Sequence, residues 1–198
     1  MARRNNATFT LDQTYGFGYG DRSLIQAFYR ALNDLCPGDM PIPIPPESQV
    51  HPQHDAETQA FIFADYAVRG IAQIALHALR VAGVERYVAT LEQLDPITDK
   101  VSAKAAADAA RVASYRLIDA AAELNPGADP GAYRAAKAAN ANAANAALLA
   151  AEAADAPDAL KTRKTRFGAS FAAHAAVEAA ELNPDATWAA VNAMLQAL

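Results

Sequence analysis

Apolar residues recur every three or four positions along most of the chain. The first such run places its members on one face of an α-helix and comprises Leu24, Ile25, Phe28, Leu32 and Leu35. Asp21 precedes the run and suits the N-cap position, where a carboxylate accepts a backbone N–H. The pattern predicts an amphipathic helix that follows Asp21 and ends near Cys36, which is expected in the core.

The run from residue 55 to about residue 82 is longer and less polar. Two adjacent rows of its helical surface are apolar, and only a narrow polar strip remains, formed by Asp65, Arg69, Gln73 and Arg80. A helix that is apolar over most of its circumference occupies a central position. His77 belongs to one apolar row and is therefore expected in the core. Gly83 is expected to end or bend this helix, and residues 84–94 are expected to form a shorter one.

Prolines divide the C-terminal half at nearly regular intervals, at positions 96, 126, 157 and 184. Each proline suits the first turn of a helix, where its missing N–H costs nothing. Asp129-Pro130 gives a second such start. The spacing predicts helices of roughly 22 to 26 residues, each about 35 Å long, followed by a shorter last helix. Short turns between helices of equal length favour antiparallel neighbours.

Alanines follow the helical period in this half and form a seam on each helix. The three seams are Ala103, Ala106, Ala110, Ala113, Leu117 and Ala120; Ala136, Ala139, Ala143, Ala146, Ala150 and Ala153; and Ala169, Ala172, Ala176 and Ala179. Small side chains let two helix backbones approach closely. We expect the seams to face neighbouring helices, and larger flanking residues such as Val112 to complete the core. Ala144 is expected on the polar flank, where it would tolerate leucine, and Asn140, Asn142 and Asn145 are expected to be exposed.

Two segments lack a helical period. Residues 1–20 end in "TYGFGYG", which predicts an irregular arm that docks its aromatic rings on the helices. A phosphate-binding loop would need a preceding strand and a GK[ST] sequence. Residues 37–53 hold the proline-rich "MPIPIPPESQVHP" and are expected to run extended over the surface. Residues 1–198 are therefore predicted to form a single all-α domain of six to seven helices, an antiparallel bundle or an irregular array.

Composition narrows the class of protein. A net charge of −5 argues against a nucleic-acid binder, which usually carries a basic surface. The single cysteine cannot form an intramolecular disulfide. Polar residues interrupt the alanine tracts, so no membrane span is predicted, and "MARRNNATFTLD" lacks the apolar core of a signal peptide. We expect a soluble cytoplasmic protein that contacts neither membrane nor nucleic acid.

The segment "KTRKTRF" is the first candidate binding site. It gathers Lys161, Arg163, Lys164 and Arg166 in an otherwise acidic chain. Such a cluster can bind phosphate or an acidic partner. The alternative is a solvated helix face with no ligand.

Histidines and carboxylates give a second candidate, a polar site made of His51, His54, Asp55, His174 and Glu178. Such residues can bind zinc or act as a general acid and base. Simpler roles are available, because Asp55 precedes a helix as an N-cap would and His174 lies one turn from Glu178. We therefore expect no metal and no cofactor, and we assign no catalytic residue.

Two stretches of the C-terminal half carry a family resemblance. They are "RYVATLEQLDPITDKVSAKAAADAARVAS" and "FGASFAAHAAVEAA". In these stretches the chain resembles the alanine-rich, all-helical proteins assigned as immunity proteins in bacterial toxin–immunity loci. The resemblance implies a non-catalytic protein that binds and neutralises a toxin, and it carries over no binding residue.

We therefore expect a non-enzymatic interaction protein whose partner is another protein. The alternative is a helical enzyme or small-molecule-binding protein, with its site between the proline-rich loop and the central helix.

Overall fold

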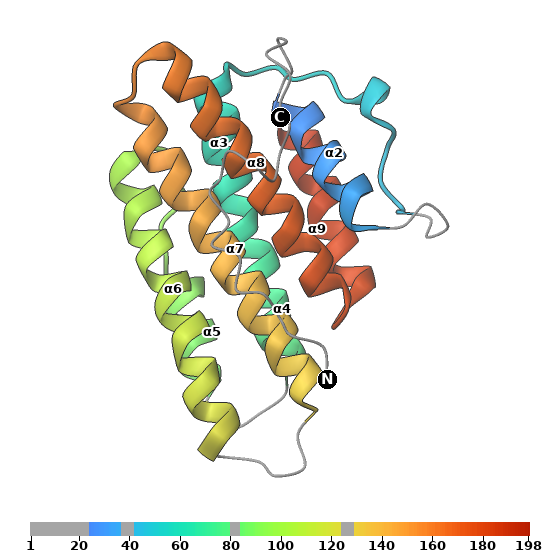
Figure 1. The fold of residues 1–198 in the computed structure, drawn as a ribbon, viewed down its shortest axis with the longest axis vertical. Helices are drawn as coiled ribbons and strands as arrows, with labels where there is room; N and C mark the ends of the chain where they lie inside the picture. The colour runs from blue at the N-terminus through green and yellow to red at the C-terminus, as the bar shows by residue number, and fades with distance from the viewer. Residues whose placement is uncertain (1–23, 37–41, 80–83, 124–128) are drawn as a thin grey trace, which may run out of the picture.

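A computed structural model describes residues 24–36, 42–79, 84–123 and 129–198 (Figure 1). These residues form helices and their connections, with no strand among them, which confirms the all-α class. The helices α6, α7 and α8 stand side by side in Figure 1, and α5, α9 and the central helix formed by α3 and α4 lie behind them. The predicted N-terminal arm, Asp21 and Gly83 fall outside the described residues.

Helix α2, Leu24–Leu35, buries its predicted apolar face against α8. Phe28 and Leu32 have no exposed surface, and the centres of the Phe28 and Phe63 rings lie 5.3 Å apart. Cys36 is buried at the helix end, and its N–H donates to the Leu32 carbonyl over 2.9 Å. The expected core position of Cys36 is therefore confirmed.

The central helix is continuous and contains a π-helical turn. It consists of α3 (Ala56–Asp65), the π-helix η2 (Tyr66–Ala72) and α4 (Gln73–Ala78). Its apolar rows pack on α7, α8 and α9, so its central position is confirmed. His77, in contrast, is exposed, and its Nε2 lies 3.4 Å from Glu92 Oε1. The prediction of a core histidine was wrong because the apolar row does not stay covered to the end of α4.

Helices α5 (Glu85–Glu92) and α6 (Lys100–Glu123) are joined by a loop that contains Pro96. The proline does not start α6 as predicted, because the helix begins four residues later. Asp99 instead caps it, with its Oδ1 accepting the Ser102 N–H over 2.8 Å. A hydrogen bond joins this loop to the central helix, in which Asp65 Oδ1 accepts the Ile97 N–H over 2.9 Å.

The last three helices begin close to the predicted prolines. They are α7 (Pro130–Ala154), α8 (Asp158–Ala180) and α9 (Pro184–Ala197), with 25, 23 and 14 residues. Asp129 and Asn183 cap α7 and α9, each accepting a backbone N–H of the first turn. The predicted lengths and antiparallel order of these helices are confirmed (Figure 1).

The alanine seams face neighbouring helices, as predicted. Every described seam side chain is at most 2 % exposed. Ala144 is also buried, at 1 % exposure, so the prediction that it lies on the polar flank was wrong. The reason is that α7 contacts α6, α8 and the central helix together, and three neighbours cover a wider arc than one seam.

The π-helical turn lies against a buried amide on α7. Asn140 has no exposed surface, which contradicts its expected exposure. Its Nδ2 donates to the Ala136 carbonyl over 2.9 Å and to the Ala72 carbonyl over 3.4 Å. A π-helix shifts the backbone hydrogen bonds away from the α-helical pattern. The amide therefore supplies a donor to a carbonyl at the end of the π-turn.

The proline-rich segment runs as a strap over the ends of α2 and α9. Apart from the short 3₁₀ turn Glu47–Gln49, its described part is non-helical, as predicted. The Tyr29 hydroxyl donates to the Pro45 carbonyl over 2.5 Å, and Asn192 Nδ2 donates to the Pro43 carbonyl over 2.9 Å. The Gln53 N–H donates to the Leu198 carbonyl over 2.6 Å.

Over the described ranges, we find no helix that combines the length and the apolar character needed to cross a bilayer.

Candidate functional site

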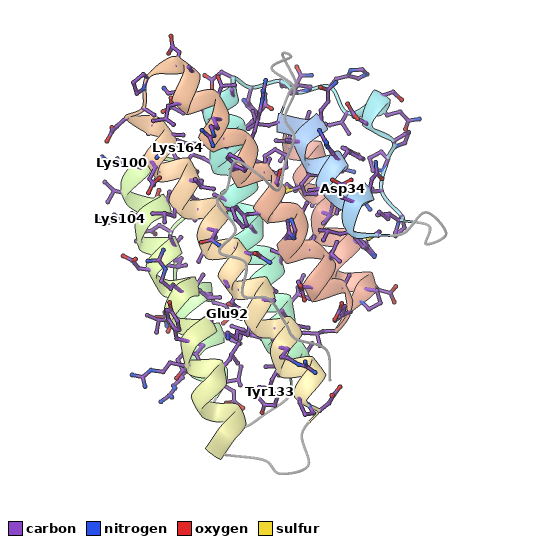
Figure 2. All side chains as sticks on the ribbon, in the orientation of Figure 1. Asp34, Glu92, Lys100, Lys104, Tyr133 and Lys164 are labelled. Atoms are coloured by element: carbon purple, nitrogen blue, oxygen red, sulfur yellow. The ribbon has the colours of Figure 1, made fainter. Side chains whose placement is uncertain are left out.

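The two lysines of the "KTRKTRF" segment join α8 to its neighbours. Lys161 Nζ lies 2.7 Å from Glu57 Oε2 on α3, and this hydrogen bond raises the pKa of the lysine. Lys164 forms an ion pair with Glu152 on α7 (Lys164 is labelled in Figure 2). Both positive charges are therefore engaged in contacts between helices.

The two arginines of this segment lie in other surroundings. The guanidinium carbon of Arg163 is 5.7 Å from the centre of the Phe167 ring. Arg166 is half-buried, and its Nε is buried without a hydrogen-bond acceptor among the described residues. The four basic residues thus divide between packing contacts and do not make one open basic surface.

The histidines before α3 do not gather into a metal centre. Asp55 is the predicted N-cap, because its Oδ1 accepts the Thr58 N–H over 2.8 Å, and this bond lowers the pKa of the carboxyl. His51 and His54 are exposed beside it. Within the described part of the chain, no three His, Cys, Asp or Glu side chains come together as a metal-binding group.

His174 and Glu178 lie on α8, on a different element from the two loop histidines. Burial lowers the pKa of His174, while the charge of Asp34 on α2 partly opposes this shift. Burial also raises the pKa of Glu178, with a further contribution from Glu181. Burial therefore favours the uncharged form of both groups, which suits packing beside the Phe171 ring, 6.2 Å from the His174 ring.

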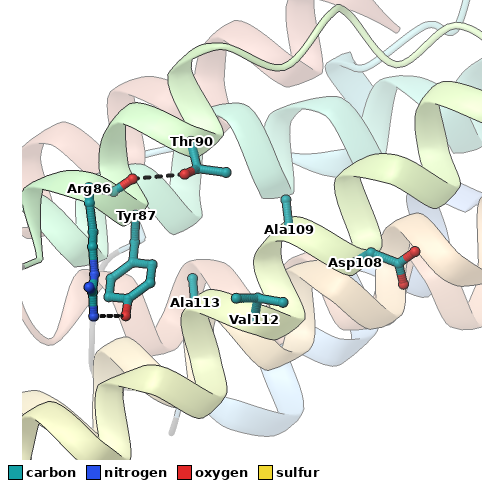
Figure 3. Close-up of a pocket in the computed structure, with 7 residues that line it drawn as sticks. All are labelled: Arg86, Tyr87, Thr90, Asp108, Ala109, Val112 and Ala113. Atoms are coloured by element: carbon teal, nitrogen blue, oxygen red, sulfur yellow. Dashed lines mark hydrogen bonds between the residues drawn. The ribbon is translucent and has the colours of Figure 1, made fainter.

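A cavity of about 330 Å³ lies between α5 and α6 (Figure 3). It is lined by Arg86, Tyr87 and Thr90 of α5 and by Asp108, Ala109, Val112 and Ala113 of α6. No residue of the proline-rich strap or of the central helix contributes to this lining. The cavity therefore does not correspond to the expected site between those two elements.

One wall of the cavity is held by contacts within α5. Arg86 donates to the Tyr87 hydroxyl, and its guanidinium carbon lies 4.6 Å from the centre of the Tyr87 ring. The Thr90 hydroxyl donates to the Arg86 carbonyl over 2.8 Å (Figure 3). The Tyr87 ring is buried, so α5 presents a fixed wall that combines an apolar ring with a positive charge.

The outer face of α6 continues from this cavity as an exposed apolar stripe. Val101, Val112 and Tyr115 are 78 %, 53 % and 63 % exposed, although their side chains are large and apolar or aromatic. At about 100° per residue they fall within a narrow arc of α6, together with exposed Ala105. We call these four residues the α6 stripe. Val112, which was expected in the core, instead belongs to this surface.

Basic residues border the α6 stripe on both sides. By helical position, Lys104 and Arg111 lie on the side away from α5, and Arg116 lies on the side toward it. Figure 2 shows Lys104 extending from the outer edge of the bundle. Arg86 stands across the cavity, and exposed Asp108, which also lines the cavity, lies by helical position within the stripe.

The sequence contained a signal for this face that the alanine pattern obscured. The α6 stripe follows the helical period with gaps of four, seven and three residues, with Asp108 inside the longest gap, and it lies on the side of the helix opposite the seam. A helix with apolar residues on two opposite sides has two faces to cover. Among the residues that the structure describes, the bundle buries the alanine side of α6 and leaves the α6 stripe exposed.

No protein-family model matches the chain, and neither a curated protein nor a solved structure matches it.

Proposed function

We propose that the protein is a non-enzymatic interaction protein that binds another protein through the outer face of α5 and α6. The observation that carries this proposal is the α6 stripe beside the α5–α6 cavity. Isolated apolar residues on a surface are ordinary, but an aligned set next to a cavity is typical of a binding surface. Tyrosine is also enriched among the residues that dominate interface energies, and Tyr115 is exposed at one end of the stripe.

The resemblance to immunity proteins supports a toxin as the partner. The longer stretch that carries the resemblance covers residues 86–114, and these residues form most of the α5–α6 face. We therefore propose that the partner is a toxin whose gene lies beside the gene for this protein. Its neutralisation requires binding alone, with no chemical step by this chain.

Co-expression with the product of the neighbouring gene tests the proposal. We expect the wild-type protein to restore growth to cells that produce the toxin. Val112→Glu should abolish this protection, because a carboxylate in the α6 stripe opposes burial of the face. The folded bundle should tolerate the change, since Val112 is exposed.

Ala193→Glu provides the matched control, because it places the same charge at an exposed position of α9. It should protect cells as well as the wild type does. A photoreactive residue at position 112 should crosslink to the toxin, whereas the same residue at position 193 should not. Full protection by a folded Val112→Glu protein would refute the proposed function.

A further inference from the structure

The α6 stripe, the cavity and the basic residues beside them indicate which kind of partner segment fits the α5–α6 face. Resting on the proposed function, we infer that the partner docks an acidic amphipathic α-helix along α6, with one apolar side chain inserted between α5 and α6. Three features of the face support this inference, namely its shape, its cavity and its charge.

The shape of the face is linear. The α6 stripe extends from Val101 to Tyr115, a distance of about 21 Å at about 1.5 Å per residue. A partner helix of four to five turns would cover it, with apolar residues three and four positions apart. This arrangement extends the packing of the bundle, where α7 already covers the opposite side of α6.

The cavity supplies a position for an anchor residue. Its apolar lining includes Ala109, Val112 and Ala113 from α6 and the Tyr87 ring from α5. Val112 belongs both to this lining and to the α6 stripe, so the two surfaces are continuous. A helix that lies on the stripe can therefore direct a leucine, methionine or phenylalanine side chain into the cavity.

The charge of the face selects an acidic partner. Lys100 already pairs with Asp155, so the charges that α6 offers beside the stripe are those of Lys104 and Arg111, with exposed Asp108 inside the stripe, in a chain whose net charge is −5. Lys104 and Arg111 border one side of the stripe, and Arg86, which donates to the Tyr87 hydroxyl, stands across the cavity on the other side. Glutamate or aspartate on the flanks of the partner's apolar face would meet these charges, which favours association and orients the helix.

The same charges disfavour a second copy of this chain as the occupant. Two α6 helices in contact would bring their basic borders together, and like charges across an interface are destabilising. An acidic helix from a different protein has no such repulsion.

A designed peptide pair measures this selectivity directly. The probe is a fluorescent amphipathic peptide of about 18 residues, roughly 27 Å long as a helix. Leucines form its apolar face and glutamates flank that face on both sides. The comparison peptide has lysine in place of each glutamate. Binding to the full-length protein is followed by fluorescence anisotropy at low and high salt.

We expect the acidic peptide to bind at least about tenfold more tightly than the basic peptide at low salt. This ratio should fall as salt rises, because exposed charges are screened. The double change Lys104→Glu with Arg111→Glu should remove or reverse the preference. Arg134→Glu with Arg163→Glu changes the same number of charges on α7 and α8 and should leave the preference intact.

The competing outcomes separate this inference from the proposed function. Equal or weaker binding of the acidic peptide would overturn the inference, and so would a dimer in sedimentation experiments that Val112→Glu dissociates. If Val112→Glu still abolishes toxin protection in either case, the proposed function stands. If Val112→Glu protects cells fully, both the function and the inference fail.

Discussion

At the scale of single residues, a buried amide determines how the central helix meets α7. Asn140 has no exposed surface, and its Nδ2 donates to Ala72 at the end of the π-turn. Its Oδ1, in contrast, is buried without a hydrogen-bond donor among the described residues. The side chain therefore contributes to stability through its Nδ2 hydrogen bonds and through the space that it fills between α7 and the central helix.

Asn140→Ala is expected to lower the free energy of unfolding by about 1–3 kcal/mol, because it removes the hydrogen bond to Ala72 and leaves unfilled space at a fully buried position. Asn142→Ala is the control in the same helix, at a half-buried position. Its effect should stay within about 0.5 kcal/mol. Both changes introduce alanine, so helix propensity alters equally. Chemical denaturation of the two variants would decide, and equal losses would argue against a special role for Asn140.

Tyr29 gives the proline-rich strap a pH-dependent attachment. Burial and, to a smaller extent, the charge of Glu47 raise the pKa of Tyr29 from 10.0 to about 12. The folded state thus favours the neutral phenol, which donates to the Pro45 carbonyl. The contribution of the Tyr29 hydroxyl to the stability of the folded state is fully present below pH 10 and is lost as the pH rises from 10 through about 12.

Tyr29→Phe should therefore be less stable than the wild type by about 1 kcal/mol at neutral pH, the usual net contribution of one hydrogen bond. The difference should disappear or reverse as the pH rises through about 12. Denaturation curves of both proteins across alkaline pH would measure it. A difference that does not change with pH would show that the hydroxyl proton is not the stabilising feature.

At the scale of helices, small side chains set the distance between neighbours. The seam of α6 is buried against the bundle, while the adjacent Ala105 on the same helix is exposed. A larger side chain fits only where the neighbouring backbone leaves space. In α7 both Ala143 and Ala144 are buried, so neither serves as a tolerant reference position.

Ala106→Leu is expected to overpack the seam and lower the free energy of unfolding by about 1–3 kcal/mol. Ala105→Leu should change it by no more than about 0.5 kcal/mol. The two positions are consecutive in one helix, so the helix propensity of the new residue is the same. Urea denaturation would compare them. A stabilising Ala106→Leu would mean that the seam contains unfilled space.

At the scale of the whole molecule, the polar residues near the start of α3 and α8 connect helices. Asp55 caps α3, Glu57 pairs with Lys161, and Glu152 pairs with Lys164. These contacts bring together residues from three helices that are distant in sequence. Lys161 and Lys164 of the candidate basic cluster and Asp55 of the candidate polar site therefore make contacts that join or cap helices of this bundle.

We expect the purified protein to contain much less than one transition metal ion per chain, because Asp55 and Glu57 already have partners and the described residues bring no three His, Cys, Asp or Glu side chains together. His51→Ala with His54→Ala should leave thermal stability unchanged in the presence of zinc. Elemental analysis and thermal denaturation provide the measurements. One zinc or iron per chain, lost in the double variant, would revive the alternative of a metal-dependent enzyme.

The positions of the helices, and most of their ends, can be read from local sequence patterns alone. Asp55, Asp129 and Asn183 act within their own first turn, so local sequence is enough to predict them. The alanine seams can also be predicted from the sequence, because a three- and four-residue period marks one side of any helix. Pro96 was misleading, since a proline that suits a first turn does not require one.

How much of each helix surface is buried depends on the packing of the helices and cannot be read from local sequence. Ala144 and Asn140 are buried because α7 has neighbours on three sides, while Val112 is exposed because none of the described helices packs on the outer face of α6. A periodic pattern marks the direction of a face but not the width of the buried arc, which depends on the number of neighbouring helices. The α5–α6 face could not be predicted from the sequence for the same reason. Its residues come from two helices and form one surface only when those helices pack together.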